Sequence, residues 1–105
     1  MGAGARGPLT EAMFYTLMVL ARRDVCGTEI AAAVAGRTEG RVKLGPGTLY
    51  TILGKFLEEK LIEETEQDAG GRRRTYRRTP AGREVYEGEL RRLEQCIRDA
   101  KEEER

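Results

Sequence analysis

The sequence contains no histidine and no tryptophan. Without histidine, a Ser-His-Asp triad, most protein metal sites and the usual neutral-pH general base are unavailable. Its two cysteines, Cys26 and Cys96, stand far apart and form no C-x-x-C unit, so we expect neither a zinc site nor a redox pair. We predict that both are buried free thiols. The composition therefore argues against an enzyme, and we expect no cofactor and no metal.

Long hydrophobic runs are also missing. No run of apolar residues approaches the roughly 20 needed to cross a membrane, and residues 1–8 lack the apolar centre of a signal peptide. We therefore expect a cytoplasmic protein with no membrane partner, in which residues 1–8 form a disordered leader. Hydrophobic residues make up 39% of the 105 residues and aromatic residues 6%. A chain this short with so thin a core gains from burial against a second chain, which favours an oligomer.

Apolar residues at helical spacing predict the helices in the first half of the chain. The first helix runs from Leu9 to Ala21 with Thr10 as its N-cap, and a second, alanine-rich helix runs from Thr28 to Ala35. Gly45-Pro46 is a start signal for a third helix, because proline is tolerated in the first turn. The core-facing side of this third helix carries Leu49, Ile52, Leu53, Phe56 and Leu57.

The chain after the third helix reads as a β-hairpin followed by a last helix. Residues 63–67 can extend as one strand, residues 68–71 supply turn residue types, and Arg74–Thr79 can return antiparallel. Thr79-Pro80 then provides an N-cap and a first turn. One face of the last helix is an apolar seam, which needs a partner, so we predict a homodimer. The predicted dimerisation residues are Tyr86, Leu90, Leu93 and Ile97.

This order of elements is that of a winged helix-turn-helix, in which the third helix enters the major groove and the hairpin lies along the DNA backbone. We predict a mainly α fold with a small β-hairpin, made of a DNA-binding domain over residues 9–79 and a C-terminal dimerisation helix over residues 80–105. The formal net charge is only +1, yet five arginines stand within residues 72–78, where a wing would meet phosphates. These features predict double-stranded DNA as the partner.

The predicted DNA contacts come from the third helix and the wing. A helix N-terminus with small residues favours a phosphate, and arginine can bind one in a bidentate way. Because side chains alternate along a strand, we expect Arg72 and Arg74 to approach DNA and Arg77 or Arg78 to form structural pairs. Tyr50 can donate its hydroxyl to a phosphate or pack against the neighbouring helix. The predicted set is Lys43, Gly47, Thr48, Tyr50, Thr51, Lys55, Arg72, Arg73 and Arg74.

Three stretches carry a resemblance to a known family: Gly-Pro-Gly-Thr-Leu-Tyr at residues 45–50, Leu-Glu-Glu-Lys-Leu-Ile at 57–62, and Arg-Thr-Tyr-Arg-Arg-Thr-Pro-Ala-Gly at 74–82. The chain resembles the short subfamily of PadR-type transcriptional regulators, from about Leu9 to the end of the last helix. The resemblance implies a homodimeric repressor on a palindromic operator, with the last helix packed against the partner's first and last helices. Where the family commonly opens its second helix with His-Gly-Tyr-Glu, this chain has Cys-Gly-Thr-Glu at residues 26–29 and lacks that tyrosine.

The resemblance also suggests an effector. Some relatives release DNA when phenolic acids or flat hydrophobic drugs occupy the dimer interface, often stacked on a tryptophan, which this chain lacks. A small hydrophobic effector would then be bound by aromatic, methionine and cysteine side chains, although such residues at helical spacing also form ordinary core. The candidate pocket residues are Phe14, Tyr15, Met18, Tyr86 and Cys96.

An alternative class is a winged-helix protein-interaction module that acts on another regulator, since a fold does not decide a function. The salt dependence of binding distinguishes the two hypotheses. Phosphate binding weakens steeply as salt is added, whereas an apolar interface with a protein partner changes little.

Overall fold

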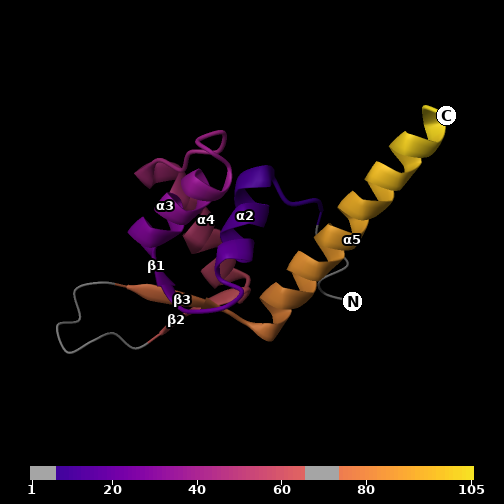
Figure 1. Ribbon diagram of the computed structural model, residues 1–105. Coiled ribbons are helices and arrows are strands. Elements are labelled where there is room, and N and C mark those ends of the chain that lie inside the picture. Colours follow the sequence, from indigo (N-terminus) through magenta and orange to yellow (C-terminus); the bar gives the residue numbers. More distant parts are fainter. Residues whose placement is uncertain (1–6, 66–73) are drawn as a thin grey trace.

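The computed structural model describes residues 7–65 and 74–105. The predicted leader up to residue 6, the predicted turn and the wing arginines Arg72 and Arg73 lie outside the described residues. The elements within them are α2 (Glu11–Val19), β1 (Val25–Cys26), α3 (Gly27–Arg37), α4 (Pro46–Glu58), β2 (Ile62–Thr65), β3 (Thr75–Arg78) and α5 (Pro80–Glu103). Helices α2, α3 and α4 lie together on one side of the small sheet, and α5 leads away from them (Figure 1).

The helices begin where local chemistry predicts. The Thr10 hydroxyl accepts a hydrogen bond from the Met13 backbone N–H at 3.1 Å, and the Thr79 hydroxyl accepts one from Gly82 at 3.0 Å. Each cap satisfies a backbone donor that would otherwise lack an intrahelical partner. Pro46 occupies the first turn of α4, as predicted. The four helices of the described chain therefore include every helix that the sequence predicted.

The sheet has one strand more than the predicted hairpin. Its order is β1-β3-β2, and both pairings are antiparallel. The two residues of β1 are buried and pair with Tyr76 and Thr75. A strand of two residues has no periodicity to detect, and here its partner comes from far along the chain. The sequence predicts no strand between the first two helices, whereas this segment joins the sheet directly to α3.

One hydrophobic core joins α2, α3, α4 and the sheet. Phe56 and Leu53 of α4 are fully buried, together with Leu17 of α2 and Ile30 of α3. Four of the five residues predicted for the inner face of α4 are buried, and Leu57 is partly buried. Burying a large aliphatic or aromatic side chain contributes about 1.5–3 kcal/mol, so this face fixes α4 in place.

The first half of α5 packs on the body and the second half does not. Glu89 is 7% exposed, and two nitrogens of Arg92 donate to its carboxylate. Arg92 is the main cause that lowers the pKa of Glu89, and a hydrogen bond from the Leu9 backbone lowers it further. Beyond residue 93 every side chain of α5 is exposed, and Figure 1 shows this end extending away from the other helices.

The two cysteines differ in burial. Cys26 is buried, as predicted, and its Sγ lies 3.4 Å from the Thr28 hydroxyl. The prediction for Cys96 is wrong, because this thiol is exposed. Cys96 lies on the half of α5 that extends past the body, where a single chain has no core to cover it.

No helix among the described residues is both long enough and apolar enough to cross a membrane.

Candidate nucleic-acid interface

The first turn of α4 is open to a ligand. Gly45 is the N-cap residue, no side chain caps the helix, and no acidic residue stands in its first turn. Gly47 and Thr48 are exposed, and nothing lies within 4 Å of where a Cβ on Gly47 would stand. Uncapped N–H groups and the positive end of the helix dipole favour an anion at this end. Thr51 continues the exposed face one turn further along.

Tyr50 lies on the flank of this face, beside the start of α3. Its side chain is 54% exposed. A Cβ added to Gly27 would stand 2.9 Å from the Tyr50 hydroxyl oxygen and 3.4 Å from the adjacent ring carbon. The ring therefore touches the neighbouring helix at its hydroxyl end and still presents most of its surface to solvent. Gly27 is a residue that the sequence did not single out, and its role follows from this close approach.

The arginines of the wing have different partners. The Arg77 guanidinium lies 3.3 Å from an Asp24 oxygen and 3.9 Å from a Glu63 oxygen. Arg78 donates to the Leu17 carbonyl at 3.3 Å and lies 5.0 Å from the centre of the Tyr86 ring. The prediction of structural pairs is confirmed for both.

Arg74 stands apart from these two because its side chain is 74% exposed. One Arg74 nitrogen lies 3.2 Å from a Glu64 carboxylate oxygen. The sequence analysis missed Glu64, although the alternation of side chains along the two strands could have paired it with Arg74.

A second tyrosine, Tyr76, lies at the base of the wing. Tyr76 of β3 is 3% exposed, and burial is the main cause that raises its pKa. The charges of Glu64 and Tyr50 raise the pKa further, while Arg74 opposes them. The Tyr50 hydroxyl also lies close to Gly27, and the preceding residue, Cys26, pairs with Thr75 of β3, so the flank of α4 approaches the base of the wing.

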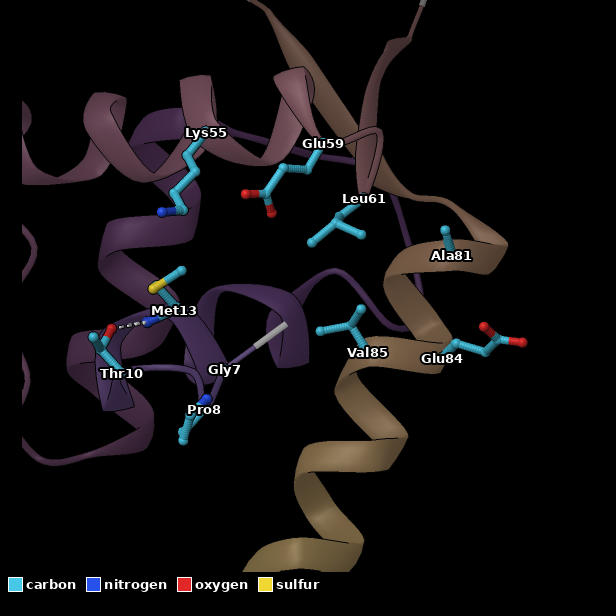
Figure 2. A pocket seen from close by; sticks show the side chains of 10 residues that line it. All are labelled: Gly7, Pro8, Thr10, Met13, Lys55, Glu59, Leu61, Ala81, Glu84 and Val85. Carbon is cyan, nitrogen blue, oxygen red and sulfur yellow. Dashed lines mark hydrogen bonds between the residues drawn. The ribbon is translucent and has the colours of Figure 1, made fainter. Parts of the chain in front are cut away.

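The two lysines predicted to contact DNA lie in different surroundings. Lys43 is exposed between α3 and α4. Lys55 points from α4 towards α2, into a cavity of about 790 Å³ between α2, α4 and α5 (Figure 2). Its contact with DNA stays a prediction. The residues that line the cavity are Gly7, Pro8, Thr10, Met13, Lys55, Glu59, Leu61, Ala81, Glu84 and Val85.

This cavity shares no residue with the predicted effector pocket. Phe14 and Tyr86 stack with their ring centres 4.9 Å apart, and Tyr15 meets Phe14 edge-on at 6.1 Å. The space between these rings is filled by their own contact. Cys96 lies further along α5, where its sulfur accepts from an Arg92 nitrogen at 3.7 Å.

The predicted dimerisation seam is partly open. Leu90 is 38% exposed and Ile97 54% exposed, while Leu93 is half-buried. Tyr86, at the start of the seam, packs on Phe14 of the same chain. Dimerisation through this seam remains a prediction.

Helix α4 has an open N-terminus, the wing is basic, and a third strand joins the wing to the helices. Together these features define a winged helix-turn-helix protein. Solved structures share this fold. A transcriptional regulator from Clostridium thermocellum matches with a TM-score of 0.76 and 22% identity, over 86% of this chain and 89% of that one. A PadR family transcription regulator from Clostridium difficile matches with a TM-score of 0.64 and 27% identity, over 86% and 97%.

The sequence comparison assigns the family. The model of the family described as transcriptional regulator PadR-like matches residues 16–88, so the chain belongs to the PadR-like family. It is also 37% identical over 79 residues to an uncharacterized 37.1 kDa protein in transposon TN4556 of Streptomyces fradiae. That match covers 75% of this chain and 22% of the relative, so the chain spans about a fifth of that protein's length.

Proposed function

We propose that this chain is a DNA-binding transcriptional repressor that acts as a homodimer on a palindromic operator. In this proposal α4 enters the major groove, its open first turn contacts a phosphate, and Arg74 contacts the backbone from the wing. The proposal is carried by the exposed face that presents the open first turn of α4 at Gly47, Tyr50 on its flank, and Arg74 at the base of the wing. It is free of acidic side chains at the helix end and ends on an arginine that is largely open to solvent.

Repression by a dimer is supported by the family and by the partly open seam on α5. A two-fold dimer places two recognition helices in successive major grooves, about one helical turn of DNA apart. A repressor of this kind acts by occupying its operator, so the proposal requires no activity other than DNA binding.

Binding of the purified protein to random-sequence duplex DNA at several salt concentrations tests the proposal. We expect binding that weakens steeply with salt, with a log-log slope of about 0.9 per neutralised phosphate. The variant with Arg72, Arg73 and Arg74 changed to Ala should lose most of it. Indifference of the unmodified protein to DNA at low salt would contradict the proposal and favour the protein-interaction module.

The proposed repressor also responds to a small hydrophobic or phenolic effector. What supports a ligand site is the cavity of about 790 Å³ with Met13, Leu61 and Val85 on its walls and the Lys55 ammonium pointing into it. Drug-sized ligands occupy pockets of about 300–1,000 Å³. Thermal stabilisation by phenolic acids, abolished in Val85→Trp but not in a matched Tyr15→Leu variant, would locate the ligand in this cavity. Loss of the stabilisation in Tyr15→Leu but not in Val85→Trp would locate the ligand among the rings of Phe14, Tyr15 and Tyr86.

A further inference from the structure

Glu64 and Arg74 form a diagonal ion pair across the two strands of the wing. Glu64 stands opposite Tyr76 in the register of β2 and β3, and Arg74 precedes Tyr76 by two residues. Because side chains alternate along a strand, all three lie on the same face of the sheet. An Arg74 nitrogen lies 3.2 Å from a Glu64 oxygen, so the pair forms on the face that carries the buried Tyr76.

This face of the wing is the one that adjoins the start of α4. Tyr76 on this face is buried in the same core as Leu49 of α4, and the Tyr50 hydroxyl lies close to Gly27, which directly follows β1. The other face has its own pairing, in which Arg77 lies between Asp24 and Glu63. On each face of the wing, a glutamate of β2 therefore lies beside an arginine: Glu63 beside Arg77 of β3, and Glu64 beside Arg74, which directly precedes β3. Of these two glutamates, Glu64 is the one that neighbours the surface proposed to bind DNA.

We propose that Glu64 determines the DNA affinity of this chain by competing with a DNA phosphate for the Arg74 guanidinium. The inference rests on the proposed function. A carboxylate and a phosphate offer the same oxygen acceptors to arginine, so Glu64 competes with the DNA backbone for the N–H donors of Arg74. The side chains of Arg74 and Glu64 are 74% and 43% exposed, and an ion pair this open to solvent is weak enough to exchange.

The test compares two neutral variants of adjacent glutamates, Glu64→Gln and Glu63→Gln, which remove the same charge from opposite faces of one strand. The readout is the affinity for a fluorescently labelled random-sequence duplex at several salt concentrations. We expect Glu64→Gln to bind about two- to fivefold more tightly than the unmodified protein, the range expected for loss of an exposed ion pair. Glu63→Gln should change less, and the gain of Glu64→Gln should shrink as salt screens the charges.

Arg74→Ala and the double variant Glu64→Gln/Arg74→Ala complete a thermodynamic cycle. In the Arg74→Ala background, Glu64→Gln should gain no more than Glu63→Gln does. The inference is overturned if Glu64→Gln binds no more tightly than Glu63→Gln, or if its gain survives the loss of Arg74. Circular dichroism spectra that match the unmodified protein establish that each variant is folded. An unmodified protein that binds no DNA at low salt overturns the proposed function itself, which separates the two failures.

Discussion

At the scale of single residues, Gly82 shows how closely α5 is set against the rest of the chain. A Cβ at this position would stand 2.0 Å from the Leu61 carbonyl oxygen and 3.0 Å from the Arg78 side chain. The same carbonyl accepts a hydrogen bond from the Thr79 backbone at 3.0 Å. The first turn of α5 is therefore fixed on the segment that follows α4, with no room for a side chain.

Gly82→Ala should lower the free energy of unfolding by more than about 2 kcal/mol, because backbone atoms must move to admit the methyl group. Urea or thermal unfolding measures this change. Gly88→Ala is the matched control in the same helix, since its nearest neighbour would be an Arg91 nitrogen at 3.8 Å. That control should be neutral or gain up to about 1 kcal/mol from helix propensity. Equal stabilities of the two variants would contradict the close packing.

Lys60 adopts a left-handed backbone conformation just after α4, with a φ of 62°. A residue with a Cβ pays about 1–2 kcal/mol there, and glycine is the usual choice after a helix end. Lys60→Gly should therefore raise the unfolding free energy by up to about 1 kcal/mol. Lys60→Ala keeps the Cβ and should bring no such gain. Equal thermal stability of the two variants would show that backbone strain at this position is negligible.

At the scale of an element, α4 carries a glycine that packing does not explain. Gly54 is exposed in the interior of the helix, and nothing lies within 4 Å of where its Cβ would stand. At 100° per residue it shares the outward side of α4 with Gly47 and Thr51. A bare backbone on this side lets the helix approach the groove closely.

Gly54→Ala should therefore act in opposite directions on stability and on binding. The unfolding free energy should rise by up to about 1 kcal/mol, because alanine is the better helix former. DNA affinity should fall, because the methyl group stands between α4 and the groove. Gly36→Ala adds a methyl group to an equally open position on a different helix, α3, and should gain stability without a change in DNA binding. A Gly54→Ala variant that binds DNA as well as the unmodified protein would contradict the proposed orientation of α4.

At the scale of the whole molecule, the side chains of α5 beyond residue 93 are all exposed, so no core formed by the described residues fixes the outer half of this helix. The chain extends 57 Å along its longest axis and 23 Å along its shortest, and the exposed end of α5 accounts for the elongated shape seen in Figure 1. An exposed Ile97 on an isolated helix is unfavourable in water, and a second copy of the helix would cover it.

Ile97→Glu should convert the proposed dimer to a monomer and leave the helix content unchanged, because Ile97 has no part in the core of one chain. Gln95→Glu adds the same charge on the opposite side of α5 and should leave the dimer intact. Sedimentation velocity measures the mass, and circular dichroism measures the helix content. If Ile97→Glu remains a dimer, the seam lies elsewhere.

The sequence alone determined the features that depend on neighbours in the chain. Three helices start where capping and proline geometry predict, at Thr10, Pro46 and Thr79. Both effects involve residues within one turn. The buried face of α4 follows from helical periodicity, and the strands of the wing follow from residue type. Family membership follows from motifs in the same local stretches.

Only the tertiary structure decided the features that depend on where the elements meet. Strand β1 exists because Val25 lies beside Tyr76, and Cys96 is exposed because α5 runs past the core. The separate partners of Arg74, Arg77 and Arg78 likewise depend on which face of the wing each one occupies and on what lies opposite. Hydrophobic spacing predicts which side of an element is buried, but it does not identify the polar group that lies on the other side of a contact. That is settled by the packing of segments far apart in the sequence.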